Sequence, residues 1–430
     1  MASKNKQFIA STMLAIFFVY SATVFLWKAF HFRPWDYSIN WMAAMALRDG
    51  KPFYDMAVMR DLAATYIAAN SRGIFTGSYN SFIGLPTTAM LHLPFTFLDF
   101  EQSVPVYRLL CLVAMSLAVF LAGLTLPVAL RVRSWLVGTL FVLWWHAPLF
   151  SLQLGQVDAW VMLSLAIALF AISREQWKLA GAGIGIAALL KISPLLLIVY
   201  CALKKQWQLV LSALLVCVAG LLLSWLPQHG EALHQFFQTV LPALGDSTRQ
   251  VQNQSLGAFC ARLFTADVNL LDFSKPVGAW KFAGFLCVAA MLLALHWRNR
   301  VLQAGDVAIV ILLALLAGPI SWDHYLSWAI LPVMLFAANL SADTTAGRHR
   351  RVLLLLLLLL PMFFPVYYVR PELVANNGWW RCVTGLQMLS LLATAVWMII
   401  RANRIDGRQM KSTGPACIIA AHPHPDQTLP

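Results

Sequence analysis

Long apolar segments alternate with short polar or charged connections along most of this chain. The stretch 352–360, for example, contains nine residues without a charge. A helix that crosses the hydrocarbon core of a bilayer needs roughly 20 apolar residues. The pattern therefore predicts an all-α, polytopic transmembrane helical bundle of about 11–13 helices.

Basic clusters divide the second half of the chain at regular intervals: 204–205, 298–300, 348–351 and 401–411. Pairs of apolar spans separate each cluster from the next: 208–226 with 280–297, 303–320 with 325–340, and 352–369 with 379–400. Two crossings return the chain to the same side, and Lys and Arg favour cytoplasmic loops. We therefore expect every cluster, and both termini, in the cytoplasm.

The first half has no unique topology. Apolar spans lie near 86–98, 105–128, 135–150, 159–172 and 179–203. Arg131 and Arg133 favour the cytoplasm, yet simple alternation of these spans puts them outside. Either the charge rule is broken locally, or one span is a re-entrant or half-length hairpin. The sequence leaves both open.

Three connections are predicted on the outer face: 29–80, 227–279, and the short turn 318–324, which is followed later by the stretch 367–380. Within 29–80, apolar residues recur at helical spacing in two sets: Trp35, Ile39, Met42 and Ala46, then Met59, Leu62, Ala63 and Tyr66. This spacing predicts two short helices at the membrane interface, the second capped by a left-handed Gly73.

Composition supports a single transmembrane domain over 1–411, followed by a disordered cytoplasmic tail over 412–430. The chain is 60% hydrophobic and 11% charged, with a mean hydropathy of +0.70. A soluble domain has about a quarter charged residues, so soluble classes are excluded. The net charge of +13 fits cytoplasmic loops better than a nucleic-acid partner. The seven cysteines form no CxxC pair and favour neither disulfides nor a metal site. We read the apolar stretch that ends at Trp27 as a retained first helix, not a cleaved signal peptide.

Lys191 is the clearest candidate for chemistry, because it interrupts an apolar run, where ionisable groups are costly. Ser193 and Pro194 follow it and fit an N-cap with proline at the first helical position. A broken helix there directs its amide groups and a lysine towards an anion such as phosphate. The alternative is a kinked helix whose lysine extends to the interface.

Asp36 and His324 are candidates on the outer face. Aromatic neighbours at 35 and 37 suit the interface, where burial raises the pKa of a carboxylate towards that of a working base. An aspartate at this place is also a common N-cap. His324, beside Trp322, Asp323 and Tyr325, suits phosphate or sugar binding, or else membership of an aromatic belt.

Amide side chains add candidates for binding sugar hydroxyls. Asn253 and Gln254 lie in the second outer connection, with Arg262 beyond, and Gln156 and Asp158 lie near the end of a span. Any polar loop contains such residues. Their convergence on the outer face, together with a base and a phosphate site, favours transfer chemistry on a lipid-linked phosphate.

Five ordered blocks over 36–325 carry a resemblance to a known family. The first comprises Asp36-Tyr37, Trp41, Ala44, Ala46-Leu47, Gly50 and Tyr54-Asp55. The others are Gly155-Gln156-Val157-Asp158; Ala180-Gly181 through Ala187-Ala188 to Lys191 and Pro194; Asn253-Gln254-Ser255-Leu256 with Arg262; and Ser321-Trp322 with His324. Together they resemble glycosyltransferase family 87, polyprenol-phosphate-sugar-dependent enzymes of the C-type membrane (GT-C) fold that include mycobacterial phosphatidylinositol mannoside mannosyltransferases. Two departures are Asp158 in place of the family's asparagine, and Tyr79 with a lone Pro86 in place of its Tyr-x-Pro-Pro.

The resemblance implies inverting transfer of a mannose- or pentose-like sugar at the outer face of the cytoplasmic membrane. The donor it implies is a polyprenyl phosphate sugar, and the acceptor is a hydroxyl of a lipid or glycan. By the same resemblance Asp36 is the general base, and Lys191 with His324 balances charge on the leaving phosphate. The sugar and acceptor would contact Tyr54, Gln156, Asp158, Asn253, Gln254 and Arg262, and no metal or other cofactor is expected.

Two other classes remain open at this point. A transporter or flippase for a lipid-linked saccharide also uses broken helices and charges at membrane depth. A membrane scaffold subunit would leave Asp36 and Lys191 without a role. The amphipathic connection after the first helix and the lack of an internal repeat favour the enzyme.

Overall fold

The computed structural model describes residues 2–32, 34–67, 82–264, 276–298, 301–342, 348–363 and 382–412. Within these ranges the chain is helical, and the one β-type pairing is an isolated bridge between Asn253 and Trp322. The all-α prediction is confirmed. The predicted Gly73 cap, Tyr79, the stretch 367–380 and the tail beyond 412 lie outside the described residues.

Among the described residues, three helices are each long and apolar enough to cross a membrane: α5 (Phe100–Leu124), α11 (Trp207–Trp225) and α15 (Trp280–Arg298). Two bent pairs meet the same criterion when each is taken as one span: α1 (Ala2–His31) with α2 (Trp35–Arg48), and α6 (Val128–Trp144) with α7 (His146–Leu154). The fold is that of a polytopic membrane protein.

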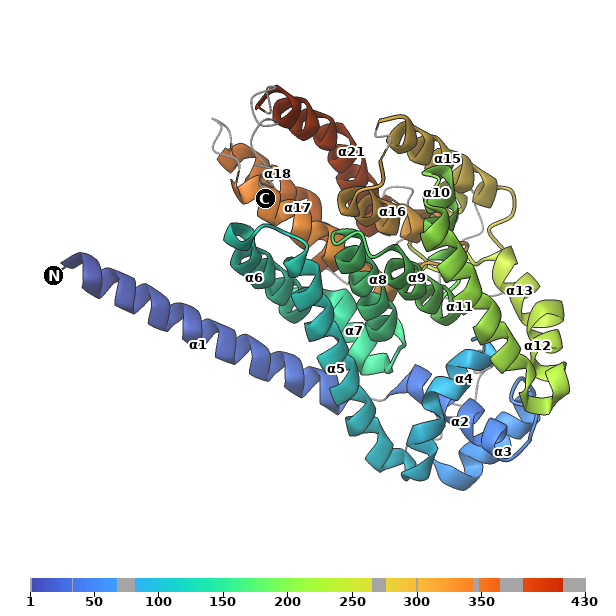
Figure 1. Ribbon diagram of the computed structural model, residues 1–430. Coiled ribbons are helices and arrows are strands. Elements are labelled where there is room, and N and C mark those ends of the chain that lie inside the picture. The colour runs from blue at the N-terminus through green and yellow to red at the C-terminus, as the bar shows by residue number, and fades with distance from the viewer. Residues whose placement is uncertain are drawn as a thin grey trace, which may run out of the picture.

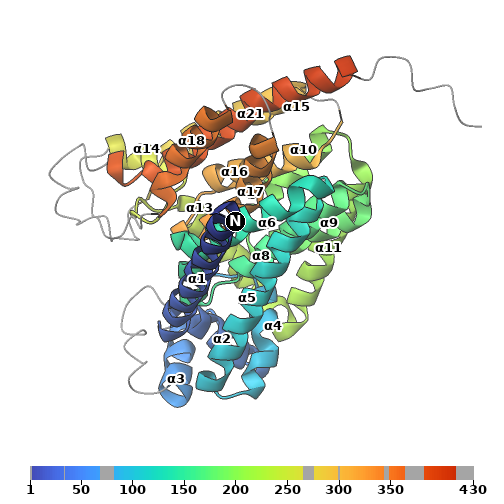
Figure 2. The ribbon, with the colours of Figure 1, turned by 90° about the vertical axis from the view of Figure 1, so that its left-hand side faces the viewer.

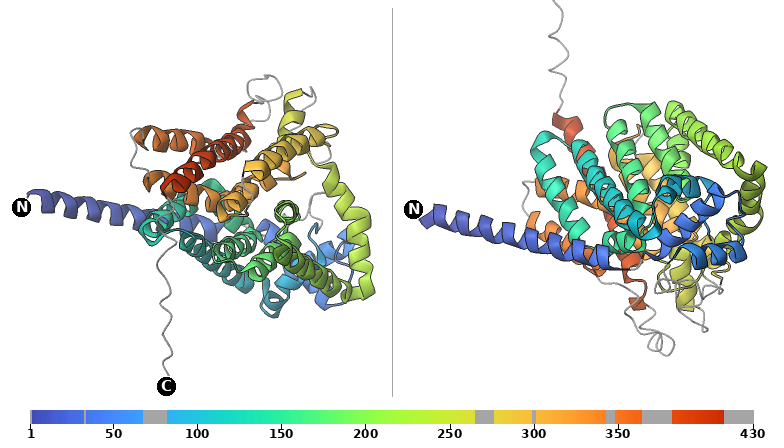
Figure 3. Two further views of the ribbon diagram at one scale, coloured as in Figure 1. Left: turned by 45° about the horizontal axis from the view of Figure 1, so that its top comes forward. Right: turned by 90° about the horizontal axis from the view of Figure 1, so that it is seen from below.

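One row of helices runs across the molecule in the order α6, α5, α8 (Asp158–Ile172), α9 (Trp177–Leu190) and α11, each packed on the next (Figure 1). A second group packs on this row and comprises α15, α16 (Ala304–Ala317), α17 (Ile330–Ala342), α18 (Arg348–Leu359) and α21 (Leu386–Ser412). The core lies between them, where every residue from 306 to 316 of α16 is buried. Helix α1 projects away from this body (Figure 3).

The predicted connection helices are confirmed as helices α2 and α3 (Met56–Tyr66), and each buries most of its apolar stripe against the protein, whereas Trp35 and Tyr66 at the ends of the stripes are exposed. They lie together with α4 (Pro86–His92) and η2 (Leu93–Phe97) at one edge of the molecule (Figures 1 and 2). The second connection also contains short helices: η3 (Pro227–Gly230), α12 (Glu231–Gln235), η4 (Phe236–Val240), α13 (Leu241–Asp246) and α14 (Leu256–Phe264).

Close glycine contacts fix the direction of α9 against α11. A Cβ on Gly181 would lie 2.2 Å from the carbonyl oxygen of Leu209, and one on Gly220 would lie 2.3 Å from Leu189. Early residues of one helix therefore face early residues of the other, so the two run parallel. The chain between them, which includes α10 (Leu195–Leu203), must run back in the opposite direction.

This reversal settles how 82–203 is arranged. Residues 86–98 form α4 and η2, which are too short to cross and lie beside α2. Residues 179–203 form a pair, α9 and α10, that turns back on itself. Of the two alternatives that the sequence left open for 82–203, the half-length hairpin is the one present, at 179–203.

This arrangement also removes the conflict between the cytoplasmic preference of Arg131 and Arg133 and the side of the membrane that simple alternation of spans gives them. Helix α5 begins beside η2 and ends near Gly123, against Trp135 of α6, so the turn before α6 lies at the far end from α2. The turn 204–206 lies at that same far end, because α10 leads away from the Lys191 break. Both basic turns thus share one end of the molecule.

Candidate functional site

Asp36 lies in the first turn of α2, where Pro34 and not Asp36 occupies the N-cap position. The capping alternative for Asp36 is therefore excluded. Gly155 ends α7 at a φ of +69°, and a Cβ there would lie 2.5 Å from the Cβ of Tyr37. Only glycine permits this contact, which brings the residue after it, Gln156, to the start of α2.

Gln156 bridges the two leading candidates. Its Nε2 donates to Oδ2 of Asp36 at 2.6 Å, and its Oε1 accepts from Nζ of Lys191 at 3.2 Å. Asp36 and Lys191, 155 positions apart in sequence, thus share one polar site.

The predicted helix break at Lys191 is confirmed. Helix α9 ends at Leu190, Lys191 adopts an extended backbone with φ −146° and ψ 135°, and α10 begins at Leu195. The predicted cap was wrong by one position, because Pro194 and not Ser193 is the N-cap residue and no side chain caps the helix. Proline cannot donate to the preceding turn, which explains why the break falls here.

Lys191 has two further partners besides Gln156. Its Nζ lies 3.9 Å from Oδ1 of Asp158 and 3.7 Å from the centre of the Tyr325 ring. Asp158 is fully buried, and Trp328 donates its indole N–H to Oδ1 at 3.1 Å. The lysine is therefore held by an aromatic face and a buried carboxylate.

His324 continues this network from η5 (Asp323–Ala329), in the turn between α16 and α17. Its Nε2 lies 3.8 Å from Oδ2 of Asp158, and its Nδ1 lies 3.7 Å from Oδ1 of Asp323. The other oxygen of Asp323 lies 4.0 Å from Nε2 of His146. Each polar group of the site, from Asp36 on α2 to His146 on α7, therefore lies within 4.0 Å of the next.

Burial shifts the pKa values of the two ionisable side chains at the start of this turn, Asp323 and His324. Removal from water raises the pKa of Asp323 to about 7, because burial penalises the charged carboxylate. Burial, followed by the charges of Lys191 and His146, holds the pKa of His324 well below its usual value. His324 is neutral at physiological pH.

Sequence analysis missed Asp323 and His146 as members of the site. Asp323 was noted only as a neighbour of His324. His146 stands alone within the apolar run 135–150, and an ionisable residue in such a run was the available signal.

Asn253 and Arg262 lie near the site, and the hydrogen bonds shown for Asn253 Nδ2 and for Arg262 Nη1 go mainly to backbone carbonyls, whereas Arg262 Nε and Nη2 are buried without a partner among the described residues. Asn253 donates to the carbonyls of Thr248 and Pro319 at 2.9 and 3.1 Å, and its Oδ1 accepts from the amide of Ser321 at 2.9 Å. Arg262 donates to the carbonyl of Asn253 at 2.8 Å. Both are fully buried, so in this structure they brace the turn that carries His324.

Gln254 and Tyr54 also donate hydrogen bonds to backbone carbonyls. Gln254 Nε2 donates to the carbonyls of Val251 and Thr384 at 2.8 and 3.1 Å. The Tyr54 hydroxyl donates to the carbonyl of Gly84 at 2.7 Å. Of the predicted sugar-binding residues, Gln156 and Asp158 contact the candidate catalytic groups directly, whereas these two link neighbouring segments.

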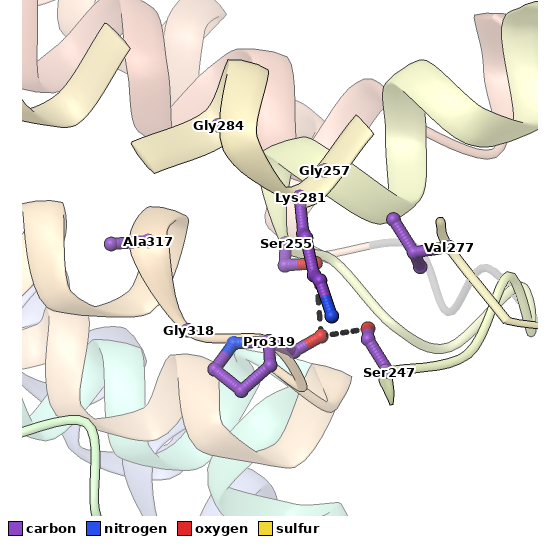
Figure 4. A pocket seen from close by; sticks show the side chains of 9 residues that line it. All are labelled: Ser247, Ser255, Gly257, Val277, Lys281, Gly284, Ala317, Gly318 and Pro319. Atoms are coloured by element: carbon purple, nitrogen blue, oxygen red, sulfur yellow. Dashed lines mark hydrogen bonds between the residues drawn. The ribbon is translucent and has the colours of Figure 1, made fainter. Parts of the chain in front are cut away.

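A hollow of about 10 Å³ lies beside the turn at Gly318 and Pro319, which Asn253 contacts (Figure 4). Ser247 and Ser255 both donate to the carbonyl of Pro319, and Lys281 points between them, donating to the carbonyl of Gly245 at 3.1 Å. Its volume admits about one water molecule, so it is a packing gap beside the turn.

Within the described ranges, no three His, Cys, Asp or Glu side chains are arranged to hold a metal ion. The groups that are assembled are a carboxylate, an amide bridge and a lysine ammonium backed by a second carboxylate. Such a set can accept a proton and balance a nearby negative charge.

An all-helical membrane fold that holds a carboxylate and a lysine ammonium in one site fits a polytopic membrane enzyme of group transfer. The family model of glycosyltransferase family 87 matches residues 82–319. The chain belongs to this family and is a membrane glycosyltransferase.

Curated relatives agree with this family. The chain is 26% identical over 388 residues to a polyprenol-phosphate-mannose-dependent alpha-(1-2)-phosphatidylinositol mannoside mannosyltransferase of Mycobacterium tuberculosis, covering 84% of this chain and 83% of that protein. It is 27% identical over 268 residues to a polyprenol-phosphate-mannose-dependent alpha-(1-2)-phosphatidylinositol pentamannoside mannosyltransferase of Mycolicibacterium smegmatis, covering 59% of this chain and 61% of that protein. The resemblance inferred from the ordered blocks is confirmed.

Proposed function

We propose that this enzyme transfers a mannose-like sugar from a polyprenyl phosphate donor to an acceptor hydroxyl, with inversion, at the outer face of the cytoplasmic membrane. The observation that carries the proposal is the bridge through Gln156, which joins Asp36 at 2.6 Å to Lys191 at 3.2 Å. Relatives whose names specify a polyprenol-phosphate-mannose donor support the choice of donor.

In the proposed reaction, the Asp36 carboxylate removes the proton of the acceptor hydroxyl. The oxygen attacks the anomeric carbon while the bond from that carbon to the phosphate oxygen breaks. The electron pair stays on the polyprenyl phosphate, whose growing charge the Lys191 ammonium balances. A single displacement of this kind inverts the anomeric centre, and general-base assistance contributes about 10²–10⁴-fold.

The contacts of Lys191 with Asp158 and Tyr325 support its role at the phosphate. Asp158, 3.9 Å from Nζ, and the Tyr325 ring at 3.7 Å fix the position of the ammonium before a donor arrives. Preorganised charge of this kind costs no reorganisation during the reaction. Neutral His324 is then able to donate one hydrogen bond to a phosphate oxygen.

Charge distribution supports the outer-face assignment. Arg131 and Arg133, near the start of α6, and Lys204, at the end of α10, lie at the end of the molecule away from α2. Because basic turns favour the cytoplasm, Asp36 would face the opposite side.

The test incubates purified protein with a panel of polyprenyl phosphate sugars and lipid or glycan acceptors. Release of polyprenyl phosphate together with a glycan product of inverted configuration, read by NMR, is the expected result. Movement of intact donor across vesicles without release would instead support a transporter and overturn the proposal.

A further inference from the structure

We propose that Arg108 of α5 is a positioning residue, which sets the contact between Asp36 and Gln156 on which the proposed reaction depends. This inference rests on the proposed function. Helices α1, α5 and α7 meet where α2 begins (Figure 1). Arg108 lies at this meeting point and is 2% exposed. A charged group at such depth must use its hydrogen-bond donors inside the protein, so the groups it contacts indicate what it holds.

All three guanidinium nitrogens of Arg108 donate to backbone carbonyls. Nη1 donates to Phe30 at 3.1 Å, and Nη2 donates to Phe32 at 2.6 Å. Nε donates to Leu152 at 3.2 Å, and Nη2 also donates to Gln153 at 2.8 Å. One side chain thus ties together two stretches of backbone about 120 residues apart in the sequence. Because the guanidinium is planar and its donors have a fixed geometry, it also fixes these stretches relative to each other.

The four carbonyls lie at helix C-termini or directly after them. Helix α1 ends at His31, and α7 ends at Leu154. The last carbonyls of a helix lack the amide donors that interior carbonyls have, and they form the negative end of the helix dipole. A cation between two such ends binds both sets of carbonyls and is stabilised by both dipoles. This explains how the apolar helix α5 accommodates a buried arginine.

Both stretches lead directly into the candidate site. Asp36 follows Phe32 by four residues, and Gln156 follows Gln153 by three. Between these points α1 gives way to α2, and α7 ends. Arg108 therefore holds the backbone at the two places from which the chain continues to Asp36 and to Gln156.

Tyr107, the neighbouring residue of α5, contacts both partners as well. Its ring stacks on that of Tyr37, next to Asp36, with the ring centres 4.6 Å apart. Its hydroxyl lies 3.4 Å from the carbonyl oxygen of Gln156. Consecutive residues of α5 thus act on both sides of the 2.6 Å hydrogen bond between Gln156 and Asp36. This helix supplies none of the proposed reacting groups, so its role is to position them.

Loss of this hold should slow the reaction without weakening donor binding. A displacement of about 1 Å in an active site can cost about 10²-fold in rate. Lys191 keeps its own contacts with Asp158 and Tyr325, so binding of the donor phosphate does not depend on Arg108. A loss of folded protein would also lower turnover, so the coupling between Arg108 and Gln156 is the deciding measurement.

The kinetic test uses Arg108→Lys, which keeps the charge but loses the planar fork, since Arg108→Ala would leave buried carbonyls unpaired. Release of polyprenyl phosphate per folded enzyme, quantified by size-exclusion chromatography, should fall about tenfold or more, with an unchanged KM for donor. In a Gln156→Ala background, which lacks the contact with Asp36, the same substitution should lower kcat less than about threefold.

A second variant and a control accompany this cycle. Tyr107→Phe keeps the stacked ring and removes the hydroxyl, so kcat should fall about threefold, and this fall should disappear in the Gln156→Ala background. Arg131→Lys is the matched control, because Nε of Arg131 also donates to a backbone carbonyl, that of Leu126 at 3.1 Å, at the far end of the molecule. It should keep the wild-type kcat.

Equal kcat values in wild type, Arg108→Lys and Tyr107→Phe would overturn the proposal. Losses that multiply with that of Gln156→Ala would also overturn it, because a role in folding alone is independent of that side chain.

Hydrogen–deuterium exchange separates this failure from failure of the proposed function. Backbone amides of 34–40 and 153–157 should exchange faster in Arg108→Lys than in Arg131→Lys, and equal exchange would show that Arg108 does not hold these stretches. If the wild type releases no polyprenyl phosphate from any donor, the proposed function fails, and the exchange still decides whether Arg108 holds the two stretches.

Discussion

At the scale of residues, Gln156 is the side chain on which the site depends, because it joins two groups from distant parts of the chain. Sequence reasoning selected Asp36, Lys191, Gln156 and Asp158 individually from residue type and position. The sequence analysis expected Asp36 and Lys191 to act in one site, but it could not predict that Gln156 joins them, because this contact depends on a left-handed Gly155 that brings the end of α7 against Tyr37.

Replacing Asp36 with Asn should abolish the base while keeping an oxygen that accepts from Gln156. We expect transfer to fall by about 10²-fold or more, with unchanged expression and unfolding temperature. Polyprenyl phosphate release measures the rate. Asp61→Asn, an exposed aspartate on α3, should keep wild-type activity; full activity of Asp36→Asn would contradict the assignment.

Replacing Lys191 with Ala should weaken use of the donor, because an ammonium–phosphate contact contributes about 1.5–3 kcal/mol. The KM for donor should rise about 10- to 100-fold. Lys178→Ala, at the exposed start of α9, is the control with the same change of charge. An unaltered donor KM in Lys191→Ala would remove the phosphate site.

Asp323 should impose a pH dependence on stability. Its pKa is raised to about 7 in the fold from an ordinary value near 3.8, so the folded state holds a proton that the unfolded chain has lost. The stabilisation is present below pH 4 and is lost as the pH rises through 7. The unfolding temperature of the wild type relative to that of Asp323→Asn should therefore fall from pH 5 to pH 7 and level off above it. A difference that is constant with pH would contradict this.

At the scale of elements, the broken α9–α10 pair decides where Lys191 lies. Pro194 after an apolar run predicted the break, since proline cannot continue the helix. The sequence could not predict that α10 turns back, because an apolar run of 25 residues fits one span equally well. The reversal depends on how α9 packs against α11 through glycines.

A methyl group at Gly181 should disrupt this packing. Its Cβ would lie 2.2 Å from the Leu209 carbonyl oxygen and 2.8 Å from Cβ of Ser212, where backbone must shift. We expect Gly181→Ala to destabilise the protein by about 1–3 kcal/mol, seen as a lower unfolding temperature in detergent. Gly305→Ala, with no atom within 4 Å of the added carbon, should not destabilise. Equal unfolding temperatures for the two variants would argue against close α9–α11 contact.

At the scale of the whole molecule, the basic turns and the candidate site lie at opposite ends. The charge clusters of the second half predicted this arrangement from sequence. The first half was ambiguous until α4 and η2 proved too short to cross, which brings Arg131 and Arg133 to the same end as Lys204.

Cysteine labelling tests this arrangement. In a variant without the seven native cysteines, Lys51→Cys, at the end of α2, should react with an impermeant maleimide in intact cells. Lys178→Cys, at the start of α9, should react only after permeabilisation. The reverse pattern would put Asp36 in the cytoplasm.

The sequence by itself determined the helical membrane fold, the interruption at Lys191 and the family, because these follow from hydropathy, proline chemistry and ordered local motifs. Only the tertiary structure decided the reversal of α10, the recruitment of Asp323 and His146, and the bracing role of Asn253 and Arg262. These depend on contacts between segments up to a few hundred residues apart, which no local pattern along the chain encodes.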